Sequence, residues 1–337
     1  MTKNLTIQSY KNIFSIALPM ILSAISIPML GIVDTAILGH LDSSVYLAAI
    51  NIGTTIFNIL FWGFGFLKMS TTGLIAQSHG KKDQDKINQQ LTQALVIALL
   101  IALILLVFQH WVGVFAISIT AEGGQVAQMA QQYFHIRILS APATLLIYVF
   151  FGYFLAIQQA RKVLFIMLVN QVGNMLLDYI FVMKYNWGIA GVAYGSIISE
   201  YAALLLGLYY LFSTKYTLPS FVQLKVWLSP SDEMKSFFVL NRDIFIRTLC
   251  LMSVFAMMTK GSARLGELTL AANAVLLNLF YLMSYGLDGF AHAIESLCGE
   301  AYGSRDKKAI KQILKHVVCD FIYYSCYIQC HLSDLWE

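Results

Sequence analysis

Residues 13–41 read IFSIALPMILSAISIPMLGIVDTAILGHL, and this stretch contains no Lys, Arg or Glu. Asp34 is its only charged side chain. A run of about 20 apolar residues is long enough to cross a bilayer as a helix. An ionised carboxylate is costly in hydrocarbon, so we expect Asp34 to face a protein-lined, wet interior and to have a function there.

A second acid occupies the same kind of setting. Residues 163–183 hold Asp178 as their only charge, with Asn174 four residues before it. This spacing places the amide and the carboxylate on one face of a helix. The alternatives are a structural acid neutralised by a neighbouring helix and an amide that only packs between helices. Because intramembrane acids are usually functional, the sequence favours a transporter with a protonatable or ion-binding centre.

The composition is that of a membrane protein. The 337 residues are 58% hydrophobic and 12% charged, with a mean hydropathy of +0.68. Soluble domains are about 25% charged. The net charge of +4 lies in the connections and indicates membrane orientation, not nucleic-acid binding. No hydrolase, phosphate-loop or metal-ligand motif is present, so we expect no enzyme activity, cofactor or structural metal.

Hydrophobic stretches predict eight strong spans and part of a ninth. Several exceed the roughly 20 residues that a span needs, so those helices should tilt or project beyond the bilayer. The predicted spans are 12–38, 45–78, 88–117, 130–157, 163–184, 188–212, 235–262 and 268–302, with a weaker stretch from about 313.

Positive charges alternate between the connections. The odd-numbered connections hold only Lys184 and Arg264. This pattern predicts a cytoplasmic N-terminus and, for a bacterial protein, insertion in the inner membrane. The N-terminal tail and the even-numbered connections carry Lys3, Lys11, Lys81, Lys82, Lys86, Arg161, Lys162, Lys215, Lys225, Lys235, Arg305, Lys307, Lys308, Lys311 and Lys315.

This orientation sets the depth of the two acids. Asp34 lies about 35 Å of helix beyond Lys11, and Asp178 lies about 24 Å beyond Lys162. We therefore expect both acids in the outer half of the membrane, close enough to share one cavity. Pro19 and Pro28 each remove a backbone hydrogen bond from the first span, which predicts a bend.

The chain contains an internal repeat. Residues 47–83 align without gaps on residues 270–306, and the matched pairs include Phe57 with Phe280 and Gly80 with Gly303. Spans one and two thus recur as spans seven and eight. An offset of six spans gives both copies the same orientation, as in transporters built from parallel repeats.

Several motifs together resemble multidrug and toxic compound extrusion (MATE) transporters over residues 10–315. Two segments, 241–249 (NRDIFIRTL) and 284–291 (SYGLDGFA), resemble the DinF branch of that family. The motifs of the wider family are Leu18-Pro19, residues 33–41 (VDTAILGHL) and residues 66–77 (FLKMSTTGLIAQ).

The resemblance implies a twelve-span fold of two six-helix bundles. Such proteins export cationic or amphipathic compounds against an inward flow of protons or sodium ions. In the family, the acid of the first span and the Asn-x-x-x-Asp pair of the fifth form the cation-coupling site. These positions correspond to Asp34, Asn174 and Asp178, and Ser196 is the nearest match to a contributing hydroxyl of the sixth span. The sequence leaves proton and sodium open, and it implies no other metal.

The predicted fold is therefore an all-α polytopic membrane protein. It consists of an N-terminal six-helix bundle (1–212), a cytoplasmic linker (213–235) and an incomplete second bundle (236–337), with eight to nine of twelve expected spans. The expected partners are the lipid bilayer and small cationic or amphipathic substrates. Two alternatives remain: a lipid or polysaccharide flippase of the wider superfamily, and a truncated fragment that does not transport.

Four further polar side chains are secondary candidates for the coupling site: Ser196, Glu200, Asp288 and Glu295. Glu200 lies mid-span, and the sequence favours neither a coupling role nor a structural role for it. Asp288, His292 and Glu295 share one helix face and are candidates for a proton relay or for metal binding. They lie near the predicted cytoplasmic surface, where the sequence favours a gate or a loop contact. The long cationic side chains within spans are expected to reach an interface; they are Lys68, Arg137 and Lys260.

Overall fold

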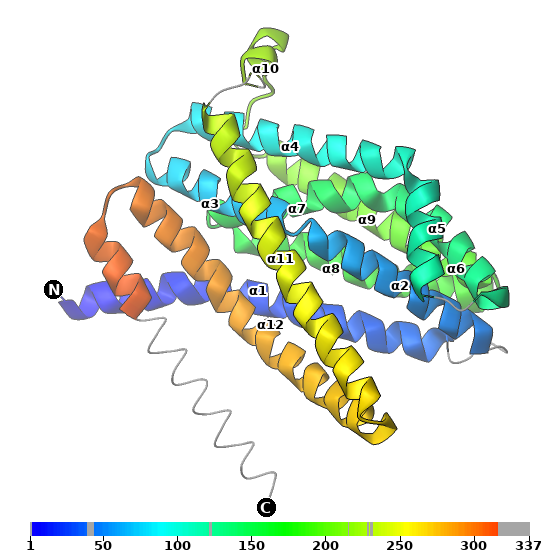
Figure 1. The fold of residues 1–337 in the computed structure, drawn as a ribbon. Coiled ribbons are helices and arrows are strands. Elements are labelled where there is room, and N and C mark those ends of the chain that lie inside the picture. The colour runs from blue at the N-terminus through cyan, green and yellow to red at the C-terminus, as the bar shows by residue number, and fades with distance from the viewer. Residues whose placement is uncertain are drawn as a thin grey trace, which may run out of the picture.

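The computed structural model describes residues 2–38, 44–120, 123–214, 216–227, 229 and 232–315. These residues form helices and short connections, with no strand among them (Figure 1). In chain order the elements are α1 (Thr2–Leu38), α2 (Ser44–Gly63), α3 (Phe66–Gly80), α4 (Gln84–Val107), α5 (Gln109–Thr120), α6 (Gly124–Arg137), η1 (Ile138–Ser140), α7 (Ala141–Ala156), α8 (Ala160–Asp178), the π-helix η2 (Tyr179–Lys184), α9 (Gly188–Phe212), α10 (Phe221–Trp227), α11 (Asp232–Arg264) and α12 (Glu267–Gly303).

The helices confirm the prediction of a polytopic membrane protein. Seven segments among the described residues are long and apolar enough to cross a membrane, and the eighth predicted span corresponds to α12. One face of α4 carries exposed apolar side chains, as a helix in contact with lipid does: Leu99, Leu100, Leu103, Ile104 and Val107. The predicted ninth stretch and the cysteines beyond residue 315 lie outside the described residues.

Helices α1 to α9 pack around α7, and we call them the first bundle. Nearly every residue of α7 is buried, including Phe150, Tyr153 and Phe154. Helix α7 contacts α3, α4, α8 and α9. The first span is one continuous helix through Pro19 and Pro28. The bend predicted at these prolines stays a prediction. Helical geometry changes at the Phe64-Gly65 turn between α2 and α3 and at the π-helix that follows Asp178.

Two turns confirm the predicted repeat in atomic detail. Lys82 and Arg305 are equivalent in the repeat, and both adopt left-handed backbone geometry, with φ of 57° and 59°. The next residue in each copy, Asp83 or Asp306, accepts hydrogen bonds from backbone N–H groups of the following helix at 3.0 Å. Each turn thus ends one helix and caps the next in the same way. We call the end of the molecule that carries these turns the turn end.

At the turn end, α3 and α12 cross with their backbones in contact. A Cβ added to Gly80 would lie 2.0 Å from the carbonyl oxygen of Glu300, and one added to Gly303 would lie 2.0 Å from that of Gln77. Gln77 and Glu300 are themselves equivalent in the repeat. The two copies therefore meet in a reciprocal contact, which we call the glycine seam, and only residues without a Cβ permit it.

Polar contacts hold the same end of α12 against the first bundle. Ser296 Oγ donates to the Leu155 carbonyl oxygen at 2.6 Å, and the Gln158 side-chain amide donates to the Glu300 carboxylate. His79 Nδ1 lies 3.6 Å from Glu300 Oε1. Residues of α12 before Gly289 are mostly exposed, whereas Ala293, Ser296 and Leu297 are buried. Helix α12 is thus anchored through its C-terminal half, and α11 and α12 run together away from the turn end (Figure 1).

The predicted division into an N-terminal bundle that ends at residue 212 and a second bundle that begins at residue 236 stays a prediction. Helix α10 lies between them, and α11 begins slightly earlier, at Asp232.

Candidate functional site

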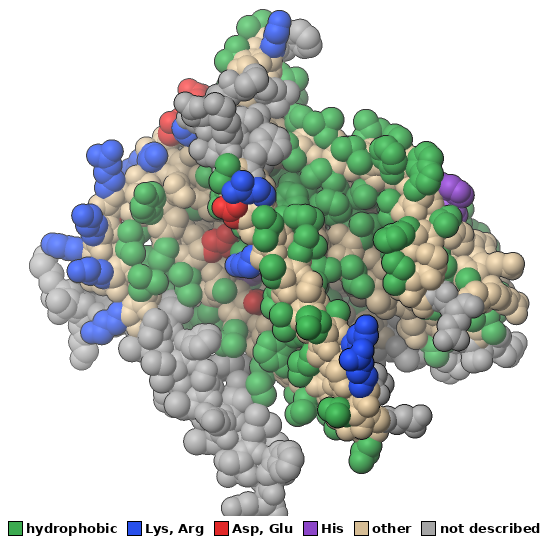
Figure 2. Space-filling model, viewed as in Figure 1, with side chains coloured by type: hydrophobic (Ala, Val, Ile, Leu, Met, Phe, Trp, Pro, Cys, Tyr) green, Lys and Arg blue, Asp and Glu red, His purple; other side chains and the backbone are tan. Residues whose placement is uncertain are grey.

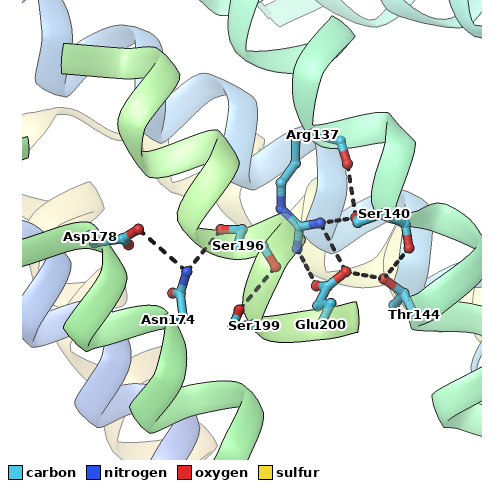
Figure 3. A network of polar contacts seen from close by, with 8 residues as sticks. All are labelled: Arg137, Ser140, Thr144, Asn174, Asp178, Ser196, Ser199 and Glu200. Carbon is cyan, nitrogen blue, oxygen red and sulfur yellow. Dashed lines mark hydrogen bonds and ion pairs between the residues drawn. The ribbon is translucent and has the colours of Figure 1, made fainter. Parts of the chain in front are cut away.

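Asn174 joins two helices beside Asp178, the most buried acid among the described side chains of the first bundle. Its Nδ2 donates to Ser196 Oγ on α9 at 3.1 Å and lies 3.5 Å from Asp178 Oδ1 on its own helix (Figure 3). Asp178 is 1% exposed and Asn174 is 5% exposed. The structure therefore brings together three of the predicted site residues, from two spans, around one amide.

Local sequence explains why these groups meet. The i,i+4 spacing on α8 aligns Asn174 with Asp178. Gly195 on α9 allows the close approach, because a Cβ at that position would lie 2.1 Å from Asp178 Oδ1. The helix changes from α to π geometry directly after Asp178. Single π-helical turns inside helices often accompany functional sites, and neither this change nor Gly195 was predicted from the sequence.

Asp34 lies near the end of α1, and α1 packs along α8 and η2. Its side chain is outside the described residues. The prediction that Asp34 and Asp178 share one cavity therefore stays a prediction.

Glu200 is paired with Arg137 of α6. The guanidinium donates to both carboxylate oxygens, one of them at 3.1 Å, and Thr144 Oγ1 donates to Glu200 Oε2 at 2.6 Å. The Arg137 and Glu200 side chains are 12% and 8% exposed. The expectation that Arg137 reaches an interface was wrong, because a buried carboxylate holds it inside the bundle. The mid-span position of Glu200 was the available signal, since an acid that stays ionised at that depth is stabilised by a cationic partner.

Asp288, His292 and Glu295 form a different group, where α12 meets α3 and α7. Lys68 of α3 is half-buried and interacts electrostatically with both carboxylates. The Phe151 ring of α7 contacts both Lys68, whose Nζ lies 4.5 Å from the ring centroid, and His292, whose ring centroid lies 5.3 Å away. His292 Nδ1 is 3.7 Å from Glu295 Oε2. These residues belong to the contact between α12 and the first bundle. Lys260, in contrast, is exposed as expected.

The described side chains contain no cluster of three or more His, Cys, Asp or Glu that could hold a metal ion. The oxygen atoms of Asp178, Asn174 and Ser196 are hard donors of the kind that bind a proton or sodium ion. This donor set alone does not distinguish the two.

A model of the MatE family matches residues 19–180 and 244–328, which is most of the chain. The chain belongs to the MatE family. The match takes in Asp34, Asn174 and Asp178 and most of α11 and α12. It leaves Ser196, Glu200 and the connection between the two halves outside.

The chain is also similar to individual members of the family. The chain is 39% identical over 300 residues to DNA damage-inducible protein F of Escherichia coli (strain K12), covering 88% of this chain and 65% of that protein. It is 24% identical over 314 residues to the probable multidrug resistance protein NorM of Bacillus cereus, and this match covers 90% of this chain and 68% of that protein. The chain thus spans just under two thirds of the E. coli relative.

The fold of a solved MatE protein agrees with the helical arrangement. An outward-facing multidrug resistance MATE family transporter matches with a TM-score of 0.86 at 19% identity, covering 96% of this chain and 72% of that one. MatE proteins are membrane transporters.

Proposed function

We propose that this chain acts in the export of cationic or amphipathic compounds, driven by the inward movement of protons or sodium ions. The observation that carries the proposal is the Asn174 amide, which holds the buried Asp178 carboxyl and the Ser196 hydroxyl in one group. Buried acids in membrane helices mark ion and proton pathways. Asp34 would complete this coupling site from α1, the helix that packs on α8.

We propose that the turn end faces the cytoplasm of a bacterial inner membrane. Lys81, Lys82 and Arg305 lie at this end. Figure 2 shows Lys and Arg side chains gathered near the α3–α4 turn and the C-terminal end of α12, while hydrophobic side chains cover α4 and α5. Cytoplasmic connections carry an excess of such charges.

The charge balance favours a cationic substrate over the anionic lipid that a flippase would carry. Arg137 is the buried cation nearest in sequence to the coupling helices, but Glu200 already neutralises it. An anionic headgroup would need a cation that remains available. Acids among apolar and aromatic side chains instead suit lipophilic cations, which gain both burial and charge pairing.

Vesicles that contain the purified chain test the proposal. A fluorescent lipophilic cation such as ethidium is loaded, and a proton gradient and a sodium gradient are imposed in separate experiments. We expect dye movement against one of these gradients, above the rate in protein-free vesicles. Movement under neither gradient, from protein shown to be folded and inserted, would refute the coupled-export function. A preference for anionic lipid probes would favour the flippase.

Gly195→Ala tests the geometry of the coupling site. The added methyl group would overlap the Asp178 carboxylate, so the carboxylate must leave its position beside Asn174. We expect the half-saturating concentration of the coupling ion to rise about tenfold. Gly173→Ala is the matched control, because its Cβ would make an ordinary 3.5 Å contact with Ser199. Equal behaviour of the two variants would contradict the proposed site.

A further inference from the structure

The Arg137–Glu200 ion pair lies one helical turn from the proposed coupling site. Glu200 follows Ser196 by four residues on α9, so both side chains project from the same face of that helix. Ser196 accepts the Asn174 amide hydrogen, and Glu200 accepts from Arg137 and Thr144. Figure 3 shows the two groups next to each other along α9.

The ion pair is anchored from several helices. The Arg137 guanidinium also donates to Ser140 Oγ of η1, and it lies 5.4 Å and 6.0 Å from the ring centroids of Phe57 and Phe61 on α2. Thr144 adds a contact from α7. A guanidinium that binds a carboxylate through two nitrogen atoms has a defined orientation. The pair therefore fixes how α9, and with it Ser196, is placed against the rest of the first bundle.

The charges of the pair balance each other. Among the described side chains, Tyr133, Tyr148 and Tyr201 interact with it electrostatically, and phenols are neutral near pH 7. Asp178 of α8 and Asp34 of α1 are the acids of the coupling site itself. Loss of Glu200 alone would leave a permanent cation close to that site, because Arg does not deprotonate in proteins. Loss of Arg137 alone would have a smaller effect, because an unpaired buried carboxylate takes up a proton.

We propose that Arg137 and Glu200 are a positioning pair for cation coupling: they orient Ser196 toward Asn174, and they keep the net fixed charge beside Asp178 at zero. This inference rests on the proposed coupling function of Asp178. It assigns Glu200 a role distinct from that of an ion-carrying residue. The reason for the distinction is that Arg137 and Thr144 already donate three hydrogen bonds to its carboxylate.

Three variants of the full chain test the electrostatic part: Glu200→Gln, Arg137→Gln and the double variant. The half-saturating concentration of the coupling ion is measured in vesicles. We expect Glu200→Gln to raise this concentration at least about tenfold, because the unpaired Arg137 cation then repels the coupling ion within the protein interior. In the double variant, the half-saturating concentration should return to within about threefold of its value in the original chain. Asp243→Asn, which breaks the exposed Arg242–Asp243 pair, is the control and should change nothing.

Arg137→Lys tests the positioning part. It keeps the charge but loses the two-point contact with Glu200. We expect an unchanged half-saturating concentration and a lower maximal rate. This variant keeps the charge balance, so it should insert even if Glu200→Gln does not.

Infrared titration of the Asp178 carboxyl band, identified by its loss in Asp178→Asn, separates this inference from the coupling function. It reports the charge beside Asp178 even if the chain moves no dye. Glu200→Gln should move the midpoint of the band to lower pH by about one unit, and the double variant should restore it. A double variant as impaired as Glu200→Gln, or midpoints that do not move, would overturn the proposal. If the original chain moves no dye under either gradient but these infrared shifts are observed, the coupling function is refuted and the charge-balancing role of the pair is not.

Discussion

Efflux driven by an ion gradient is expected to disappear when Asp178 is replaced by Asn. The amide keeps the size of the side chain and its place beside Asn174, but it cannot bind and release a proton or offer a negative charge to sodium. Dye efflux under the effective gradient should fall to the level of protein-free vesicles. Asp34→Asn should have the same effect, since both acids are expected to serve one site.

Asp85→Asn is the control for Asp178→Asn, because it removes an exposed carboxylate at the turn end. Both variants should insert and melt like the original chain. Undiminished efflux in Asp178→Asn would remove this residue from the mechanism, and with it the observation that carries the proposed function. A partial loss in Asn174→Ala or Ser196→Ala would agree with a supporting role for the amide and hydroxyl.

The second large effect is expected at the glycine seam. Gly80→Ala or Gly303→Ala would place a methyl group 2.0 Å from a backbone carbonyl oxygen of the opposite helix, so α3 and α12 must separate. Helix backbones are stiff, and no side-chain rotation relieves such an overlap. We expect transport to fall at least about tenfold, because the turn end cannot close as it does in this structure.

The separation of the helices can be measured directly. Spin labels at the exposed positions Lys81 and Lys307 should report a longer distance in both seam variants. Gly73→Ala is the matched control on α3, since a Cβ there meets nothing within 4 Å. Unchanged label distances and transport in Gly80→Ala and Gly303→Ala would show that the seam is not required for closure.

Most of the fold could be predicted because its signals are local. Each span is a run of apolar residues with few charges, and a bilayer requires such runs to be helical. The repeat was also visible, because its two copies share the residues that make the same turn, from Gly80 to Asp83 and from Gly303 to Asp306. One consequence was missed. The alignment paired the two glycines but did not reveal that they pack against each other's helices.

The part of the candidate site that lies on α8 was predictable because its signal is also local in the sequence. Asn174 and Asp178 lie one turn apart on one helix, so their proximity follows from helical geometry alone. Glu200 and Arg137 were each noticed separately. Their pairing was not, since 63 residues separate them and each lies on a different helix.

The sequence by itself determined the membrane class, the helical spans, the repeat and the pair of polar residues on α8. These depend on composition and on spacings of a few residues. Only the tertiary structure decided which helix faces which. It placed Ser196 beside Asn174, Arg137 against Glu200, and Lys68 near the acids of α12. The physical reason is that lipid and protein interior are similarly apolar, so hydrophobicity does not specify how a membrane helix is rotated. That rotation is set by close packing at small residues such as Gly195, and by polar groups that find partners across helices.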